Sequence, residues 1–271
     1  MKIETRGPVS FLGMISFIFV MFLFLSGSFE GNLSTIVYIL AFILPILIGY
    51  KSSADRNGEK DFLSLGGVKG ALPFIAPTIL IIMALSFVTT FIVTKVTGKA
   101  NEIDLGGSIV LAIISHALVP AILEEALFRY IPMRVMKREK MIETVLWSSI
   151  FFSLIHHSFF SMPYAFLAGV IFMLLNLYTG SVWPSVIIHF INNALSVLWY
   201  FYGSSPVFVA VAISLLSVLA VASVIYIIIK REKYAKFISE LLSDKPQIKP
   251  PMEVWLLGGA MIIIAVMELF V

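Results

Sequence analysis

Residues 206–229 read PVFVAVAISLLSVLAVASVIYIII, a stretch of 24 residues without Asp, Glu, Lys or Arg. A helix that crosses a bilayer needs about 20 mostly apolar residues, so this stretch predicts a transmembrane helix. Seven more stretches satisfy the same criterion: 11–29, 33–50, 71–93, 107–133, 143–160, 163–179 and 182–201. A further apolar run, 254–271, lies beyond a polar segment. The sequence therefore predicts an all-α, polytopic membrane protein with eight transmembrane helices and a possible ninth at the C-terminus.

The composition of the chain excludes a soluble enzyme. Of its 271 residues, 59% are hydrophobic and 13% are charged, whereas a soluble domain has a charged share of roughly 25%. Cysteine is absent from the sequence, which excludes a cysteine nucleophile, a thiolate metal site and disulfide bonds. Lys and Arg lie in short patches between apolar stretches, so we expect membrane lipids rather than nucleic acid as partners.

The distribution of Lys and Arg predicts the orientation of the helices. Cytoplasmic loops of membrane proteins are enriched in both residues. The N-terminus, the second and fourth connections and the segment after 206–229 contain sixteen of the 19 basic residues, whereas the opposite side contains Lys95 and Lys99. We therefore expect an integral membrane protein with a cytoplasmic N-terminus, located in the plasma membrane of a prokaryote or the endoplasmic reticulum of a eukaryote.

The predicted helix 107–133 contains ionisable side chains that a bilayer disfavours. An ionised group at the centre of the hydrocarbon costs about 2.5–3.5 kcal/mol or more, so each one needs a structural or functional reason. Glu125 and Arg129 are four residues apart with the acid first, the order that favours an ion pair within a helix. Glu124 points about 100° away from Glu125 and therefore needs a partner from another helix.

Two other predicted helices supply polar partners. His189 and Asn193 are four residues apart, so both side chains project from one stripe of their helix. His156 lies on a separate predicted helix. From a rise of 1.5 Å per residue, we place Glu124 and His189 roughly 10–14 Å from the cytoplasmic ends of their helices, where they could meet.

Three known intramembrane mechanisms lack their motifs. The sequence has no HExxH motif, which a zincin-type metalloprotease needs for its ligands and base. No predicted helix contains Asp, which excludes an aspartyl dyad. A serine and histidine pair has no GxSxG motif to support it. What remains is chemistry that uses Glu with His.

Three motifs on three separate predicted helices carry a family resemblance. EExxxR stands at 124–129, FxxxH at 152–156 and HxxxN at 189–193. With these motifs in this order, residues 107–201 resemble the type II CAAX prenyl endopeptidases and their bacterial and archaeal relatives, also called the CPBP or Abi family of glutamate intramembrane proteases.

The resemblance implies a hydrolytic mechanism at Glu124. In this mechanism Glu124 is the general base that activates a water molecule held together with His156, and the resulting hydroxide attacks the scissile carbonyl. Asn193, with His189, donates hydrogen bonds to the oxyanion that forms. These four residues are the catalytic residues that we expect.

The resemblance also implies the supporting residues, the substrate and the domain organisation. Glu125 and Arg129 would orient the helix and balance its charge. The substrate would be a prenylated CAAX protein, hydrolysed near its C-terminus without a metal or another cofactor. We expect N-terminal helices over 1–106, a catalytic core over 107–201, and a C-terminal helix, polar segment and apolar run over 202–271.

Two alternatives remain open at this point. Glu124, His156 and His189 supply the His₂Glu set of a zinc hydrolase. The chain could also be a non-catalytic membrane protein, such as a bacteriocin-immunity factor, a scaffold or a transporter, in which the polar cluster gates or pairs helices. We assign structural roles to His116 and His157, because each points away from the predicted site. The oligomeric state is open.

Overall fold

The computed structural model describes residues 32–52, 62–98, 105–135, 141–156, 161–243 and residue 259. All regular secondary structure in these ranges is helical, which confirms the all-α class. The helices are α2 (Asn32–Ser52), η2 (Leu65–Gly67), α3 (Val68–Thr97), α4 (Ile109–Ile113), η3 (Ile114–Leu118), α5 (Val119–Glu125), η4 (Ala126–Tyr130), α6 (Ile131–Val135), α7 (Met141–Leu154), α8 (Met162–Thr179), α9 (Trp183–Tyr202), α10 (Pro206–Ile229) and α11 (Arg231–Leu242).

Five helices of the described part are long and apolar enough to cross a membrane. They are Leu65–Thr97, Ile109–Arg134, Met162–Thr179, Trp183–Tyr202 and Pro206–Ile229. Two shorter apolar helices, Ile39–Lys51 and α7, fall below that length. The predicted stretches 11–29 and 254–271 lie outside the described residues. The structure therefore gives an integral membrane architecture with five candidate spans, and the predicted number of eight stays a prediction.

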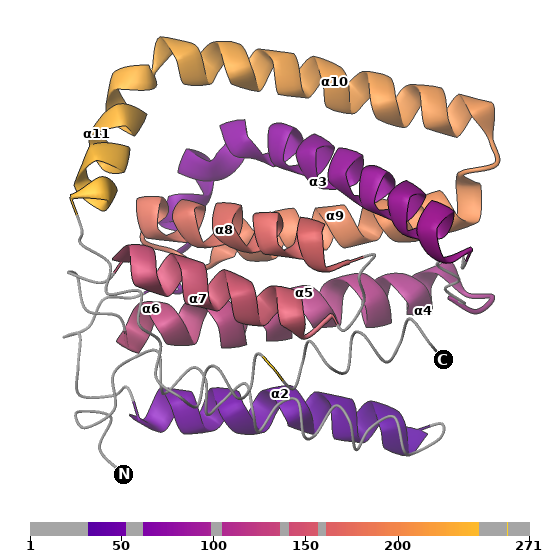
Figure 1. The fold of residues 1–271 in the computed structure, drawn as a ribbon, viewed down its shortest axis with the longest axis horizontal. Coiled ribbons are helices and arrows are strands. Elements are labelled where there is room, and N and C mark those ends of the chain that lie inside the picture. Colours follow the sequence, from indigo (N-terminus) through magenta and orange to yellow (C-terminus); the bar gives the residue numbers. More distant parts are fainter. Residues whose placement is uncertain are drawn as a thin grey trace.

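The long helices lie side by side (Figure 1). Helix α3 packs against α10 on one side and against α8 and α9 on the other. Helices α7 and α8 form a further pair, and α9 contacts the run from α4 to α5. Helix α2 contacts α5, η4 and α6 on the far side of the molecule from α10. Helix α11 runs across the ends of the bundle, where it contacts α7 and α10.

The apolar core lies where α3, α8, α9 and α10 meet. Its buried members are Ile79, Ile82, Ala168, Phe172, Leu175, Ile188 and Leu216. On the neighbouring face of α8, Gly169 allows α7 to approach closely, because a Cβ atom at this position would lie 3.0 Å from Cα of Ser149. These contacts fix α8 between α3 and α7 and hold the start of α9 against the centre of the bundle.

The turn between α8 and α9 is tied to the segment that precedes α3. Three consecutive carbonyl oxygens of that segment accept hydrogen bonds from Ser181 and Val182 of the turn and from Trp183, the first residue of α9. The bonds are Val182 N to Phe62 O (2.9 Å), Trp183 Nε1 to Leu63 O (2.7 Å) and Ser181 Oγ to Ser64 O (2.6 Å). The first turn of α9 is therefore anchored at its N-terminal end.

Two π-helical turns interrupt the span that contains α5. They are η3 and η4, and they lie directly before and after α5. One carbonyl in each turn accepts a hydrogen bond from a different helix: His116 O from Nδ2 of Asn193 at 3.3 Å, and Phe128 O from Oγ of Ser148. Side chains that bond to freed carbonyls stabilise such irregular turns, which occur frequently at functional sites.

The predicted helix 143–160 is wrong in its extent. Helix α7 has 14 residues, Met141–Leu154, and is followed by a turn. The backbone N–H of His156 bonds to the carbonyl of Ser153, three residues earlier, because the helix tightens as it ends. His156 therefore lies in the turn after α7 rather than inside a spanning helix. His157, to which the sequence assigned a structural role, lies outside the described residues.

Candidate active site

The candidate site is centred on two adjacent carboxylates in α5. Glu124 and Glu125 are buried, with relative exposures of 8% and 0%. Arg129 lies in the π turn η4 that follows, and its Nη1 atom is 3.2 Å from Oε1 of Glu125. The ion pair expected between residues four apart is therefore present, although the turn that joins them is π-helical.

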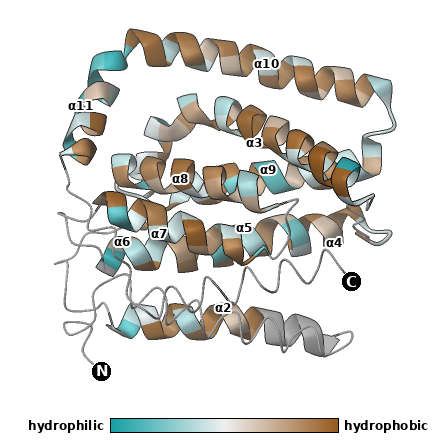
Figure 2. Cartoon of the chain, viewed as in Figure 1, coloured by the Kyte–Doolittle hydropathy of each residue, from teal (hydrophilic) through white to brown (hydrophobic). Residues whose placement is uncertain are grey.

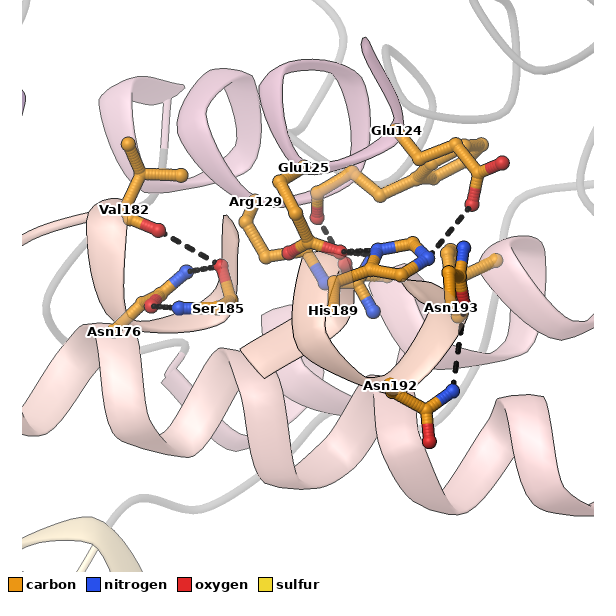
Figure 3. A network of polar contacts seen from close by, with 12 residues as sticks. Glu124, Glu125, Arg129, Asn176, Val182, Ser185, His189, Asn192 and Asn193 are labelled. Carbon is orange, nitrogen blue, oxygen red and sulfur yellow. Dashed lines mark hydrogen bonds and ion pairs between the residues drawn. The ribbon is translucent and has the colours of Figure 1, made fainter. Parts of the chain in front are cut away.

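His189 of α9 contacts both carboxylates (Figure 3). Its Nδ1 atom lies 2.9 Å from Oε1 of Glu125, and its Nε2 atom lies 3.8 Å from Oε2 of Glu124. The first distance is that of a hydrogen bond, whereas the second is too long for one and leaves an ionic contact. The imidazole thus lies between the two acids, with one ring nitrogen directed at each.

The two acids differ in how fully they are engaged. Oε1 of Glu125 is shared by Arg129 and His189. Oε2 of each acid is buried and makes no hydrogen bond with any residue of the described ranges. The described contacts of Glu124 reduce to the 3.8 Å ionic contact with His189. A carboxylate in this situation keeps lone pairs for a further donor. Glu124 is therefore the member of the pair that is open to a reaction partner.

The guanidinium group of Arg129 is buried between an acid and two aromatic rings. Its Cζ atom lies 3.9 Å from the ring centroid of Phe152 and 5.5 Å from that of Phe172. Within the described ranges, none of its three nitrogens makes a hydrogen bond that meets geometric criteria. The charge of Arg129 is therefore balanced by the ion pair with Glu125 and by the electron-rich faces of the rings.

Phe152 is a central residue that the sequence analysis used only to recognise a motif. Its ring centroid lies 5.0 Å from that of His156 and 5.9 Å from that of His189, both in edge-to-face geometry. The same ring meets Phe128 at 5.8 Å and stacks under Arg129. An aromatic residue inside an apolar stretch gives no sequence signal for such contacts, because the pattern is also that of an ordinary core residue.

His156 reaches the cluster through its aromatic neighbour. Its Nδ1 atom lies 2.8 Å from the backbone carbonyl oxygen of Phe152, one turn earlier. This contact satisfies one of the carbonyls that the end of α7 leaves without an intrahelical partner. The expected role of His156, to hold a water molecule together with Glu124, stays a prediction.

Asn193 lies one turn beyond His189 on α9 (Figure 3). Its Nδ2 atom donates to the carbonyl oxygen of His116, and its Oδ1 atom accepts from Nδ2 of Asn192, both at 3.3 Å. A side-chain amide has two N–H groups, so a second donor of Asn193 remains for a ligand. The imidazole of His116 is exposed and lies 2.8 Å from Oγ of Ser115.

The zinc alternative gains no support from this geometry. Across the described ranges, no three His, Cys, Asp or Glu side chains are grouped so that they could hold one metal ion. Glu124 and His189 are close, but the set of Glu124, His156 and His189 does not form a metal-binding group.

The comparisons with known proteins identify the region that contains this site. Residues 106–195, about one third of the chain, match the family model described as type II CAAX prenyl endopeptidase Rce1-like. The matched interval contains all six residues that the sequence assigned to the site. No curated protein and no solved structure matches the chain. The family recognised from the motifs is therefore confirmed over these residues.

Proposed function

Since residues 106–195 are an Rce1-like domain of the type II CAAX prenyl endopeptidase family, we propose that this membrane protein is an intramembrane endopeptidase. Its substrate is a prenylated CAAX protein, and it hydrolyses a peptide bond near the C-terminus of that substrate. The attacking water molecule is activated by Glu124. The division of the chain into 1–106, a catalytic core over 107–201 and 202–271 belongs to the same proposal.

The observation that carries the proposal is the unequal engagement of two adjacent buried acids. Oε1 of Glu125 is held by both Arg129 and His189, whereas the described contacts of Glu124 reduce to an ionic contact with His189 at 3.8 Å. A structural ion pair explains one acid in this place but not two, because an unpaired buried carboxylate is costly. Glu124 therefore keeps lone pairs for a reactant, as a general base needs.

The proposed reaction conserves its protons. Glu124 takes a proton from water, and the hydroxide adds to the carbonyl carbon of the scissile bond. The free N–H of Asn193 stabilises the oxyanion, and Nε2–H of His189 does so in an imidazolium whose Nδ1–H is bonded to Glu125. When the C–N bond breaks, Glu124 returns the proton to the leaving amine. His156 holds the water against Glu124 in this scheme.

Glu125 and Arg129 act on this reaction through position and charge. The hydrogen bond from His189 Nδ1 to Glu125 directs the opposite nitrogen, Nε2, toward Glu124. Arg129 offsets the charge of Glu125, so that two carboxylates can be buried next to each other. Neither residue contacts the reacting atoms in this scheme.

The test is cleavage of a farnesylated CAAX reporter peptide by the full-length protein purified in detergent. The same peptide without the prenyl group is assayed in parallel, so that catalysis and lipid selection are measured together. We expect cleavage of the farnesylated peptide, and a rate for Glu124→Gln lower by a factor of about 10²–10⁴, the usual contribution of general base catalysis.

The matched control is Glu232→Gln, the same change at an exposed acid of α11. We expect this variant to cleave at the wild-type rate. Equal rates for the wild type and for folded Glu124→Gln would refute the assigned base. If the wild type cleaves neither peptide, the non-catalytic alternative is favoured.

A further inference from the structure

A polar side chain buried outside the acid cluster determines how α9 begins. Asn176 lies in the last turns of α8 and has a relative exposure of 0%. An amide buried in an apolar bundle is unfavourable unless its hydrogen bonds are satisfied. The neighbours of Asn176 are therefore informative.

The side chain of Asn176 makes two hydrogen bonds to one residue of α9 (Figure 3). Its Nδ2 atom donates to Oγ of Ser185 at 2.7 Å, and its Oδ1 atom accepts from the backbone N–H of Ser185 at 3.2 Å. The hydroxyl of Ser185 in turn donates to the carbonyl of Val182 at 2.9 Å. Both side chains are fully buried.

This arrangement replaces the cap that α9 lacks. The first N–H groups of a helix have no intrahelical acceptor. The N-cap residue of α9 is Val182, which has no side-chain acceptor, and Pro184 has no N–H. Asn176 supplies the missing acceptor to Ser185 from another helix. The backbone carbonyl of Asn176 accepts a hydrogen bond from Gly180 N at 2.8 Å, at the C-terminal end of α8.

Ser185 lies one helical turn before His189. Residues four apart project from the same face of a helix, about 6 Å apart along its axis. The bonds from Asn176 fix both the rotation and the height of that face relative to α8. A shift of one residue in α9 would rotate His189 by about 100° and break its 2.9 Å contact with Glu125.

We propose that Asn176 is a positioning residue, which holds His189 between Glu124 and Glu125 through its two bonds to Ser185. The inference rests on the proposed function for its kinetic consequence, but the geometry that it concerns exists without a substrate. Asn176 does not contact the carboxylates among its described contacts, so its effect on the reaction passes through α9.

The test uses Asn176→Leu, Ser185→Ala and the double variant, assayed on the farnesylated reporter peptide. We expect Asn176→Leu to lower kcat about 10-fold or more with KM within about twofold, because Asn176 is fully buried between α8 and α9. Ser185→Ala retains its backbone N–H and should lose less. The double variant should have the same kcat as Asn176→Leu alone, since both substitutions remove the hydrogen bond between Asn176 and Ser185.

The matched control is Ser149→Ala, which removes another fully buried hydroxyl, one that bonds within its own helix to Val145 O. We expect it to leave kcat unchanged, because its hydroxyl does not bond to another helix in the described contacts. Equal losses of kcat in the two serine variants would overturn the positioning role and leave a role in stability. If Asn176→Leu does not fold, this serine comparison decides.

A second readout separates this inference from the proposed function. With ¹⁵N-labelled histidine, the ring signals of His189 are assigned by comparison with His189→Gln. We expect Ser185→Ala and Asn176→Leu to shift those signals and Ser149→Ala to leave them in place. Unshifted signals in both Asn176→Leu and Ser185→Ala would refute the positioning role of Asn176, even in a protein that cleaves no peptide.

Discussion

Helices α9 and α10 follow each other in the chain and differ in what their polar groups contact. Both are long and apolar enough to cross a membrane. In α9, Ser185, His189 and Asn193 each bond to a residue outside the helix. In α10, Ser223 donates to Leu219 O of its own helix at 2.7 Å. Figure 2 shows that α10 is almost uniformly hydrophobic, whereas α9 is mixed.

The difference separates a helix whose polar groups bond to other helices from a helix whose side chains are largely exposed. The side chains of α10 are exposed along most of its length, with Val218 at 67% and Val221 at 62%. Among the described helices, α10 packs mainly against α3. A hydroxyl that bonds to its own helix costs little in lipid, whereas one that bonds across helices specifies a geometry. Substitutions in or against α9 should therefore affect activity, and those on the exposed face of α10 should not.

Among substitutions in α9, the largest effect should follow the loss of the imidazole that this helix places between the acids. His189→Gln removes the ring nitrogens that meet Glu124 and Glu125, and we expect the cleavage rate to fall by about 10²–10³, the range for one stabilising donor. The control is His116→Gln, whose side chain is exposed and whose carbonyl is unchanged. A loss of equal size in the control would remove the distinction between these two histidines.

The next effect concerns the buried charge that faces α9. Arg129→Leu leaves Glu125 without its cation, and breaking a buried pair in this way costs about 3–5 kcal/mol of folding free energy. Thermal unfolding in detergent measures the loss. The double variant Glu125→Leu/Arg129→Leu should recover part of the stability and none of the activity. No recovery would mean that Arg129 stabilises mainly through Phe152 and Phe172.

A smaller effect tests a bond between helices against a bond within one. Ser148→Ala removes the donor to Phe128 O in η4 and should cost about 1 kcal/mol, the usual net value of a hydrogen bond. Ser223→Ala in α10 makes the same chemical change at a hydroxyl bonded to its own helix and should be close to neutral. Equal shifts in melting temperature would contradict the comparison of the two regions.

The smallest effect should come from the exposed face of α10. Val218→Ala removes two methyl groups from a side chain that touches little of the protein, and we expect a change below about 0.5 kcal/mol. Cleavage should continue at the wild-type rate. A loss as large as that of Ser148→Ala would instead show that this face is covered by a partner.

Five of the predicted spans and the ion pair could be predicted because each depends on local sequence. A run of apolar residues marks a span whatever surrounds it, and the spacing of Glu125 and Arg129 makes them neighbours on any helix. The length of α7 could not be predicted, because the apolar pattern continues past Leu154 while the chain turns. The composition of a segment indicates whether it lies in an apolar or an aqueous environment, but it does not indicate where the helix ends.

The contacts that complete the site depend on more than one helix, so no periodicity reveals them. Phe152 resembles any core aromatic, and Asn176 resembles an isolated polar residue near a helix end. The acceptor of Asn193 is the carbonyl of His116, a backbone atom that every residue has. The π turns are equally hidden, since an extra residue in a turn leaves the composition of the helix unchanged.

The two acids lie in a short α-helical segment that has a π-helical turn at each end. In each turn a backbone N–H bonds to the carbonyl five residues earlier: Val119 N to Ile114 O and Ile131 N to Ala126 O. Each turn therefore contains one residue more than an α-helical turn. Deleting one of residues 126–128 would place Arg129 three positions after Glu125 instead of four. The extra residue in η4 therefore sets the spacing between the two charges.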